Sequence, residues 1–97
     1  MIRIVKSPNS TKKYRAILPD GKTVDFGAAG YSDYTKHKDP ERKQRYIIRH
    51  QKRENWTPSG IHTAGFWSRW ILWGEPTLNA SKKYTQKVVL KNKVQIV

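Results

Sequence analysis

The residues best suited to chemistry in this chain are cations that recur at helical spacing in its middle third. Eight Lys and Arg residues lie between Lys36 and Glu54. Five of them fall within about 100° of one another on a helical wheel: Arg42, Arg45, Arg49, Lys52 and Arg53. Many charged helix faces are simply solvated, but five cations with no interleaved acid repel one another. We therefore favour contact between this stripe and a polyanion such as a phosphate backbone.

Residues typical of a helix start precede the cationic stripe. Asp39 is suited to cap a helix, Pro40 suits the first helical position, and Glu41 favours the positive end of the helix dipole. We expect this helix to span about residues 39–54 and to stop before the Trp56–Gly60 segment. The helix would then present its cations along one side.

Two further helices are predicted after the cationic one. Thr63 suits the N-cap of a helix at about 63–73, whose apolar arc contains Phe66, Trp67, Trp70, Ile71 and Trp73. Aromatic side chains can stack on unpaired bases, but in so small a chain we assign most of them to the core. A shorter helix is expected at about 78–86.

The ends of the chain favour strands. Residues 1–26 contain short alternating runs separated by turn residues, notably Pro19-Asp20-Gly21-Lys22, and predict an antiparallel meander. The glycine pair in Gly27–Tyr31 indicates a packing turn more strongly than an anion site. Asn92-Lys93, between two β-branched runs, predicts a terminal hairpin or a strand that joins the N-terminal sheet. The expected fold is α+β: one domain over 1–97, with a small antiparallel sheet, two or three helices and an aromatic-rich core.

Composition narrows the class of protein. The 97 residues carry a formal net charge of +13, and the basic segments flank a neutral aromatic block at 55–81. This division favours a folded centre with cationic surfaces. There is no cysteine, which excludes disulfides and thiolate metal sites. No run approaches the roughly 20 apolar residues of a membrane span, and the N-terminus lacks a signal-peptide pattern, so we expect a soluble, unprocessed chain without membrane contact.

A set of motifs between Phe26 and Ser81 resembles a known family. They are FGA-x-GYSDYT, HKD-x-x-RK-x-RY, RH-x-x-x-ENW, SGI-x-TAGFWSRW and LW-x-x-PTL-x-AS. The combination is similar to a small family of uncharacterised proteins of nucleocytoplasmic large DNA viruses, among them mimivirus, marseillevirus and chlorella-virus relatives. The resemblance implies a viral protein of the virion or of the infected host cell, with a family core at 27–81 and a basic C-terminal segment at 82–97. It implies no catalytic residues.

These observations lead to a first hypothesis of a non-enzymatic protein that binds double-stranded DNA, largely non-specifically, and helps to package a genome. Phosphate contacts would come from twelve cations: Lys36, Lys38, Arg42, Arg45, Arg49, Lys52, Arg53, Lys82, Lys83, Lys87, Lys91 and Lys93. No cofactor or metal is expected.

Two alternatives belong to other classes. The first is a minor capsid or cement component that binds virion structural proteins, with exposed Trp56 or Trp67 as anchors. The second is a metal-dependent nuclease, whose candidate ligands or bases are Asp33, His37, Asp39, His50 and His62. Their spacing matches no known metal-binding signature, so we rank the nuclease last.

Overall fold

An alternating pattern of apolar residues forms the N-terminal sheet. In the computed structural model, which describes all residues from Met1 to Val97, three antiparallel strands are adjacent in sequence order. They are β1 (Arg3–Lys6), β2 (Lys12–Ile17) and β3 (Thr23–Ala28). Their register aligns Ile4, Ala16 and Val24, which are all buried. The predicted meander and the α+β class are confirmed.

The C-terminus joins this sheet at the free edge of β1. Ile2 forms a parallel bridge with Ile96, and the Ile2 amide donates to the Gln95 carbonyl at 2.7 Å. The Ile4 amide likewise donates to the Val97 carbonyl at 2.9 Å. The chain end therefore completes the sheet through one isolated bridge, so the predicted C-terminal strand is present only in this short form.

The predicted hairpin around Asn92-Lys93 is wrong. Val88 and Val89 belong to a π-helical segment, η3 (Thr85–Val89), which continues helix α4 (Leu78–Tyr84). Asn92 adopts a left-handed φ of 60°, and its amide donates to the Gln86 carbonyl at 2.8 Å, which ends the helix. Burial of Thr85 and Leu90 by the helix outweighs the β-propensity of the valine pair.

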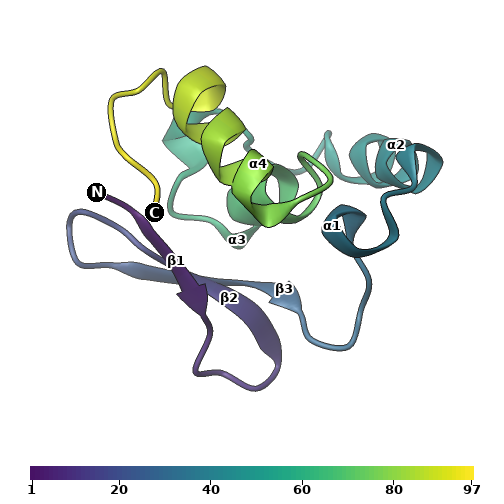
Figure 1. The fold of residues 1–97 in the computed structure, drawn as a ribbon, viewed down its shortest axis with the longest axis horizontal. Helices are drawn as coiled ribbons and strands as arrows, with labels where there is room; N and C mark the ends of the chain where they lie inside the picture. The colour runs from purple at the N-terminus through teal and green to yellow at the C-terminus, as the bar shows by residue number, and fades with distance from the viewer.

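A second helical unit covers the buried face of the sheet. Helix α3 (Ala64–Trp67) continues into π-helical η2 (Ser68–Leu72), which agrees closely with the predicted helix at 63–73. Trp67 is fully buried and lies against Phe26 of β3, with ring centroids 6.4 Å apart. Figure 1 shows α3 and α4 together on one side of the sheet.

The cationic helix lies to the side of this core. Helices α1 (Tyr34–His37) and α2 (Pro40–His50) follow the end of β3, as Figure 1 shows. The Asp39 carboxylate accepts a hydrogen bond from the Glu41 amide at 3.0 Å, so α2 begins as predicted. It ends at His50, short of the predicted Glu54, and α1 was not predicted.

After α2 the chain turns back through the 3₁₀ turn η1 (Pro58–Gly60) to α3. On the way, Trp56 packs near Tyr46 of α2, with parallel rings whose centroids are 6.3 Å apart. None of the helices combines the length and the apolar composition required to cross a bilayer.

Candidate functional site

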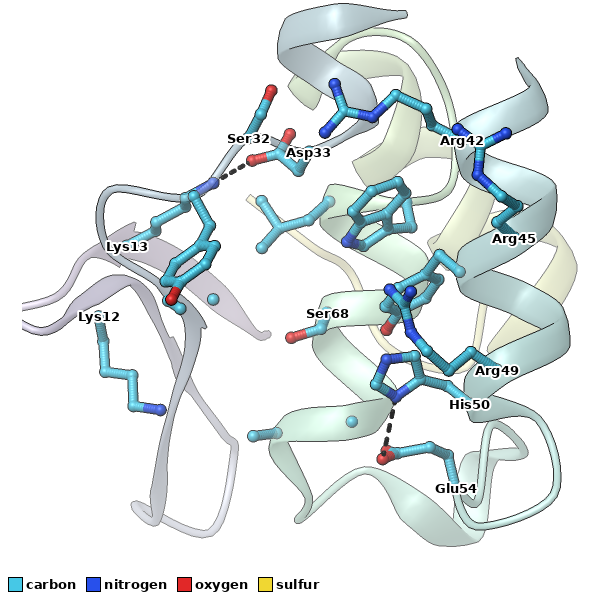
Figure 2. A pocket seen from close by; sticks show the side chains of 18 residues that line it. Lys12, Lys13, Ser32, Asp33, Arg42, Arg45, Arg49, His50, Glu54 and Ser68 are labelled. Carbon is cyan, nitrogen blue, oxygen red and sulfur yellow. Dashed lines mark hydrogen bonds and ion pairs between the residues drawn. The ribbon is translucent and has the colours of Figure 1, made fainter. Parts of the chain in front are cut away.

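A cleft of about 550 Å³ separates α2 from the nearby ends of β2 and β3. Lys12 and Lys13 line it from the sheet, and three arginines line it from α2 on the opposite side: Arg42, Arg45 and Arg49. Figure 2 shows these cations on the two sides of the cleft. The predicted arginine stripe therefore forms one wall of a concave site with a second cationic wall opposite.

Aromatic stacking fixes the orientation of α2 toward this cleft. Tyr46 is 7% exposed and stacks on Trp73 and on His50, with ring centroids 4.5 Å apart in each pair. Burial, followed by the nearby Glu54 carboxylate, raises the pKa of the Tyr46 phenol, so the ring stays neutral. Because Tyr46 lies beside the arginine stripe on the helix, its burial leaves the arginines at the cleft.

A hydrogen bond from Lys43 anchors the same helix to the turn after η2. The Lys43 ammonium donates to the Gly74 carbonyl at 2.7 Å and lies 5.0 Å from the centre of the Tyr34 ring. Burial, and next the charge of Arg69, lower the pKa of Lys43. Lys43 thus acts in packing, and the arginines remain as the accessible cations of α2.

Four exposed cations that line the cleft have no carboxylate partner. The ion pairs of the protein are Lys13–Asp33 and Arg15–Asp25, and two histidines contact carboxylates, in His50–Glu54 and His62–Asp20. None of them includes Lys12, Arg42, Arg45 or Arg49, and all four of these side chains are exposed. Since like charges on facing walls repel, a bound anion would relieve their repulsion.

Two carboxylates also line the cleft, in different environments. Asp33 is 2% exposed, accepts a bond from Lys13 Nζ at 2.5 Å, and caps α1 by accepting from the Thr35 amide at 2.9 Å. Glu54 lies 3.9 Å from His50 Nδ1, a loose contact. Asp33 is therefore committed to structure, whereas Glu54 contributes negative charge to the site.

The end of β3 and the loop that follows it border the same cleft. Gly27, inside β3, has φ +79°, and a Cβ built on it would lie 2.6 Å from Leu72 Cδ1. The close packing predicted for this glycine segment is therefore at Gly27, and the turn itself follows at Ala29-Gly30. Farther along, Tyr31 is 73% exposed and lines the cleft, so an aromatic ring is available beside the cations.

The predicted cations are distributed over several surfaces. Arg42, Arg45 and Arg49 meet at the cleft, whereas Lys38 adopts a left-handed φ at the end of α1 and donates to the Thr35 carbonyl at 3.0 Å. Lys52 and Arg53 follow the end of α2 and do not continue its helical stripe, because the helix stops at His50.

The C-terminal lysines lie away from the cleft, on α4, on η3 and in the turn that follows: Lys82, Lys83, Lys87, Lys91 and Lys93. Sequence reasoning missed Lys12 and Lys13, the second wall. The adjacent lysine pair is visible in the sequence, but only the fold, which places the start of β2 across the cleft from α2, gives it a role.

The residues considered for metal chemistry do not converge. His37 accepts from the Asp39 amide through Nδ1 at 2.9 Å and packs on Trp73, and His62 contacts Asp20 at 3.0 Å. The structure brings no three His, Asp or Glu side chains together in an arrangement suited to a metal ion.

Comparison with known proteins gives one match. Residues 2–50 match the model of a family of unknown function, DUF5754. The chain belongs to this family. The matched segment runs from the N-terminal sheet through α2, so it contains both cationic walls of the cleft. The matched segment overlaps the motifs that resemble the viral family only over residues 26–50. No curated protein and no solved structure matches the chain.

Proposed function

We propose that this protein is a non-enzymatic DNA-binding protein that holds double-stranded DNA mainly through its phosphates. The observation that carries the proposal is the cleft with Lys12 and Lys13 on one side and the three exposed arginines of α2 on the other. Arginine forks suit phosphate oxygens, and lysines add point charges. A net charge of +13 supplies long-range attraction to the polyanion.

Genome packaging in the virion of a large DNA virus is the biological role that we propose for this binding. The viral part of the proposal is supported by the motifs between Phe26 and Ser81. The remaining predicted cations, from Lys36 to the C-terminal lysines, lie outside the α2 cleft and contribute to the net charge of +13. Phosphate contact without base readout suits a protein that coats DNA of any sequence.

The test is the salt dependence of binding to a labelled DNA duplex. Each phosphate neutralised contributes about −0.9 to the slope of log K against log salt, so an Arg42→Gln/Arg45→Gln variant should lose about 1.8 of slope. An Arg3→Gln/Lys22→Gln variant is the matched control, because it removes the same charge at exposed positions outside the cleft. Equal behaviour of the two variants, or weak binding by the wild type, would refute the proposal.

A structural role in the virion, as a minor capsid or cement protein, is the second candidate. Tyr84 and Val88 lie four residues apart on the continuous α4–η3 helix and are 38% and 54% exposed. They form an apolar pair available to a shell protein. Trp67 is fully buried and Trp56 is half-buried, so the expectation of an exposed Trp67 anchor is wrong. Tight binding to capsid protein without salt-sensitive DNA affinity would favour this role.

A further inference from the structure

A second cleft, also of about 550 Å³, lies on the other side of the Lys12-Lys13 pair. It is lined by the loop after β1, by residues 29–30 and by the start of α1. The two clefts share Lys12, Lys13 and Asp33. The same short segment of β2 therefore separates two concave surfaces and contributes cations to both.

The cations of the second cleft come from three separate elements. The pairing of β1 with β2 puts Lys6 opposite Tyr14, at the same end of the sheet as Lys12. Lys36 comes from α1, whose first turn is held by the Asp33 cap. The amide of Ala29 donates to the Thr11 carbonyl at 3.0 Å and holds the loop between these elements.

The carboxylate that lines this second cleft already has hydrogen-bonding partners. Asp33 is its only carboxylate, and its two oxygens are bound by the Lys13 ammonium and by the Thr35 amide and hydroxyl. Lys6, Lys12 and Lys36 are exposed and form no ion pair. Three free ammonium groups around one concave surface, with the Ser10 hydroxyl beside them, suit phosphate oxygens.

We infer that the second cleft binds phosphates of the same DNA strand whose neighbouring phosphates occupy the α2 cleft. This inference rests on the proposed function and extends it. Lys12 and Lys13 lie at the crossing point, so the strand passes from Arg42, Arg45 and Arg49 over β2 to Lys6 and Lys36. The two clefts are then one continuous phosphate track, reaching beyond the helix that dominates the sequence pattern.

The test compares two double variants on the same labelled duplex across a salt series. Lys6→Gln/Lys36→Gln removes two cations of the second cleft, and we expect the salt slope to fall by about 1.8 with one protein still bound per site. Arg3→Gln/Lys22→Gln is the control: Arg3 and Lys22 are at the other end of the sheet, because Arg3 pairs with Ile17 and Ile17 with Thr23. The control should keep the wild-type slope.

Each other outcome has a definite meaning. If the Lys6/Lys36 variant matches the control while the Arg42/Arg45 variant loses slope, the track is wrong and the proposed function stands. If the second cleft binds a separate duplex, sedimentation will show two duplexes per protein, which also overturns the track. If the wild type shows no salt-dependent binding, both proposals fail. Thermal unfolding of each variant checks that it is folded.

Discussion

The rings of Tyr46 and Trp73 lie parallel, at an interplanar angle of 3° and with centroids 4.5 Å apart. This pair joins α2 to the end of η2, and it is extended by His50 on one side of the pair and His37 on the other. Because Tyr46 is the buried residue of α2, the orientation of the arginines toward the cleft depends on this stack, together with the Lys43–Gly74 hydrogen bond.

Replacing the stacked ring should therefore destabilise the protein. We expect Tyr46→Ala to lower the free energy of unfolding by about 3 to 5 kcal/mol, as for other large aromatic side chains removed from a core. Tyr46→Phe should remain close to wild type, because burial and nearby charges, and no hydrogen bond, act on the hydroxyl, and the ring is retained. Urea unfolding followed by tryptophan fluorescence measures both. Similar losses in the two variants would mean that the hydroxyl, and not the stack, is what matters.

Local signals explain why much of the fold could be predicted. Asp39-Pro40 starts α2, Thr63 caps α3, and the Pro19–Lys22 turn joins β2 to β3, where Gly21 has φ +85°. Each of these positions contains a residue whose own backbone or side chain favours the observed geometry. Their structure required no knowledge of distant contacts.

The end of α2 was mispredicted because tertiary contacts determine it. No Gly or Pro follows His50 until Pro58, so the sequence pattern continues to Glu54. In the structure, Trp70 Nε1 donates to the Trp56 carbonyl at 2.9 Å, and the Arg69 guanidinium lies 5.3 Å from the Trp56 ring. These contacts draw the chain back toward η2 and end the helix early.

Only one wall of the candidate site could be predicted from the sequence, for the same reason. A helical wheel groups Arg42, Arg45 and Arg49, since they are on one helix. Lys12 and Lys13 lie about 30 residues earlier in the sequence, and no local periodicity links them to α2. Their place in the site follows from packing between the sheet and the helices, which a single sequence does not encode in any short pattern.

Gly27 provides a test of that packing between sheet and helix. Gly27→Ala should destabilise the protein by roughly 2 to 4 kcal/mol, because it adds a methyl group 2.6 Å from Leu72 Cδ1 and strains a left-handed φ. Gly21→Ala is the matched control, since Gly21 has a similar φ of +85° with nothing within 4 Å of its Cβ position. Chemical denaturation of both variants separates the clash from the backbone strain. Equal losses would show that Leu72 moves aside freely.

His37 should make stability depend on pH. Burial lowers its pKa below the ordinary value of 6.5, and the charge of Arg42 lowers it further, against smaller opposing effects of Asp39 and Asp33. The folded state therefore binds fewer protons than the unfolded state just below pH 6.5, so stability is lost as the pH falls through that range.

The measurement is urea unfolding of wild type and His37→Asn at pH 7.5 and pH 5.5, conditions either side of the ordinary histidine pKa. Asn keeps an acceptor for the Asp39 amide but does not titrate. We expect the wild type to lose more stability between the two conditions than the variant does. An identical loss in both proteins would assign the pH dependence to other groups.

Removing the negative charge of Glu54 should tighten DNA binding. Its carboxylate lines the cleft among five cations, so it repels any phosphate that enters, and its 3.9 Å contact with His50 contributes little. Glu54→Gln keeps the size of the side chain. This matters because the side chain packs closely on Gly65: a Cβ built on Gly65 would lie 1.3 Å from Glu54 Oε2. We expect DNA affinity at low salt to rise roughly two- to fivefold, the scale of a single exposed charge interaction.

The control for this variant is Asp20→Asn, which also removes one negative charge but in the turn between β2 and β3, outside both clefts. Asn retains the oxygen that accepts from the Lys22 amide. A rise in affinity for Glu54→Gln alone locates the phosphates at the cleft, because a local repulsion is relieved. A similar rise in both variants reflects net charge alone, and no rise in either means that the DNA does not pass Glu54. Fluorescence anisotropy with the same labelled duplex distinguishes these three results.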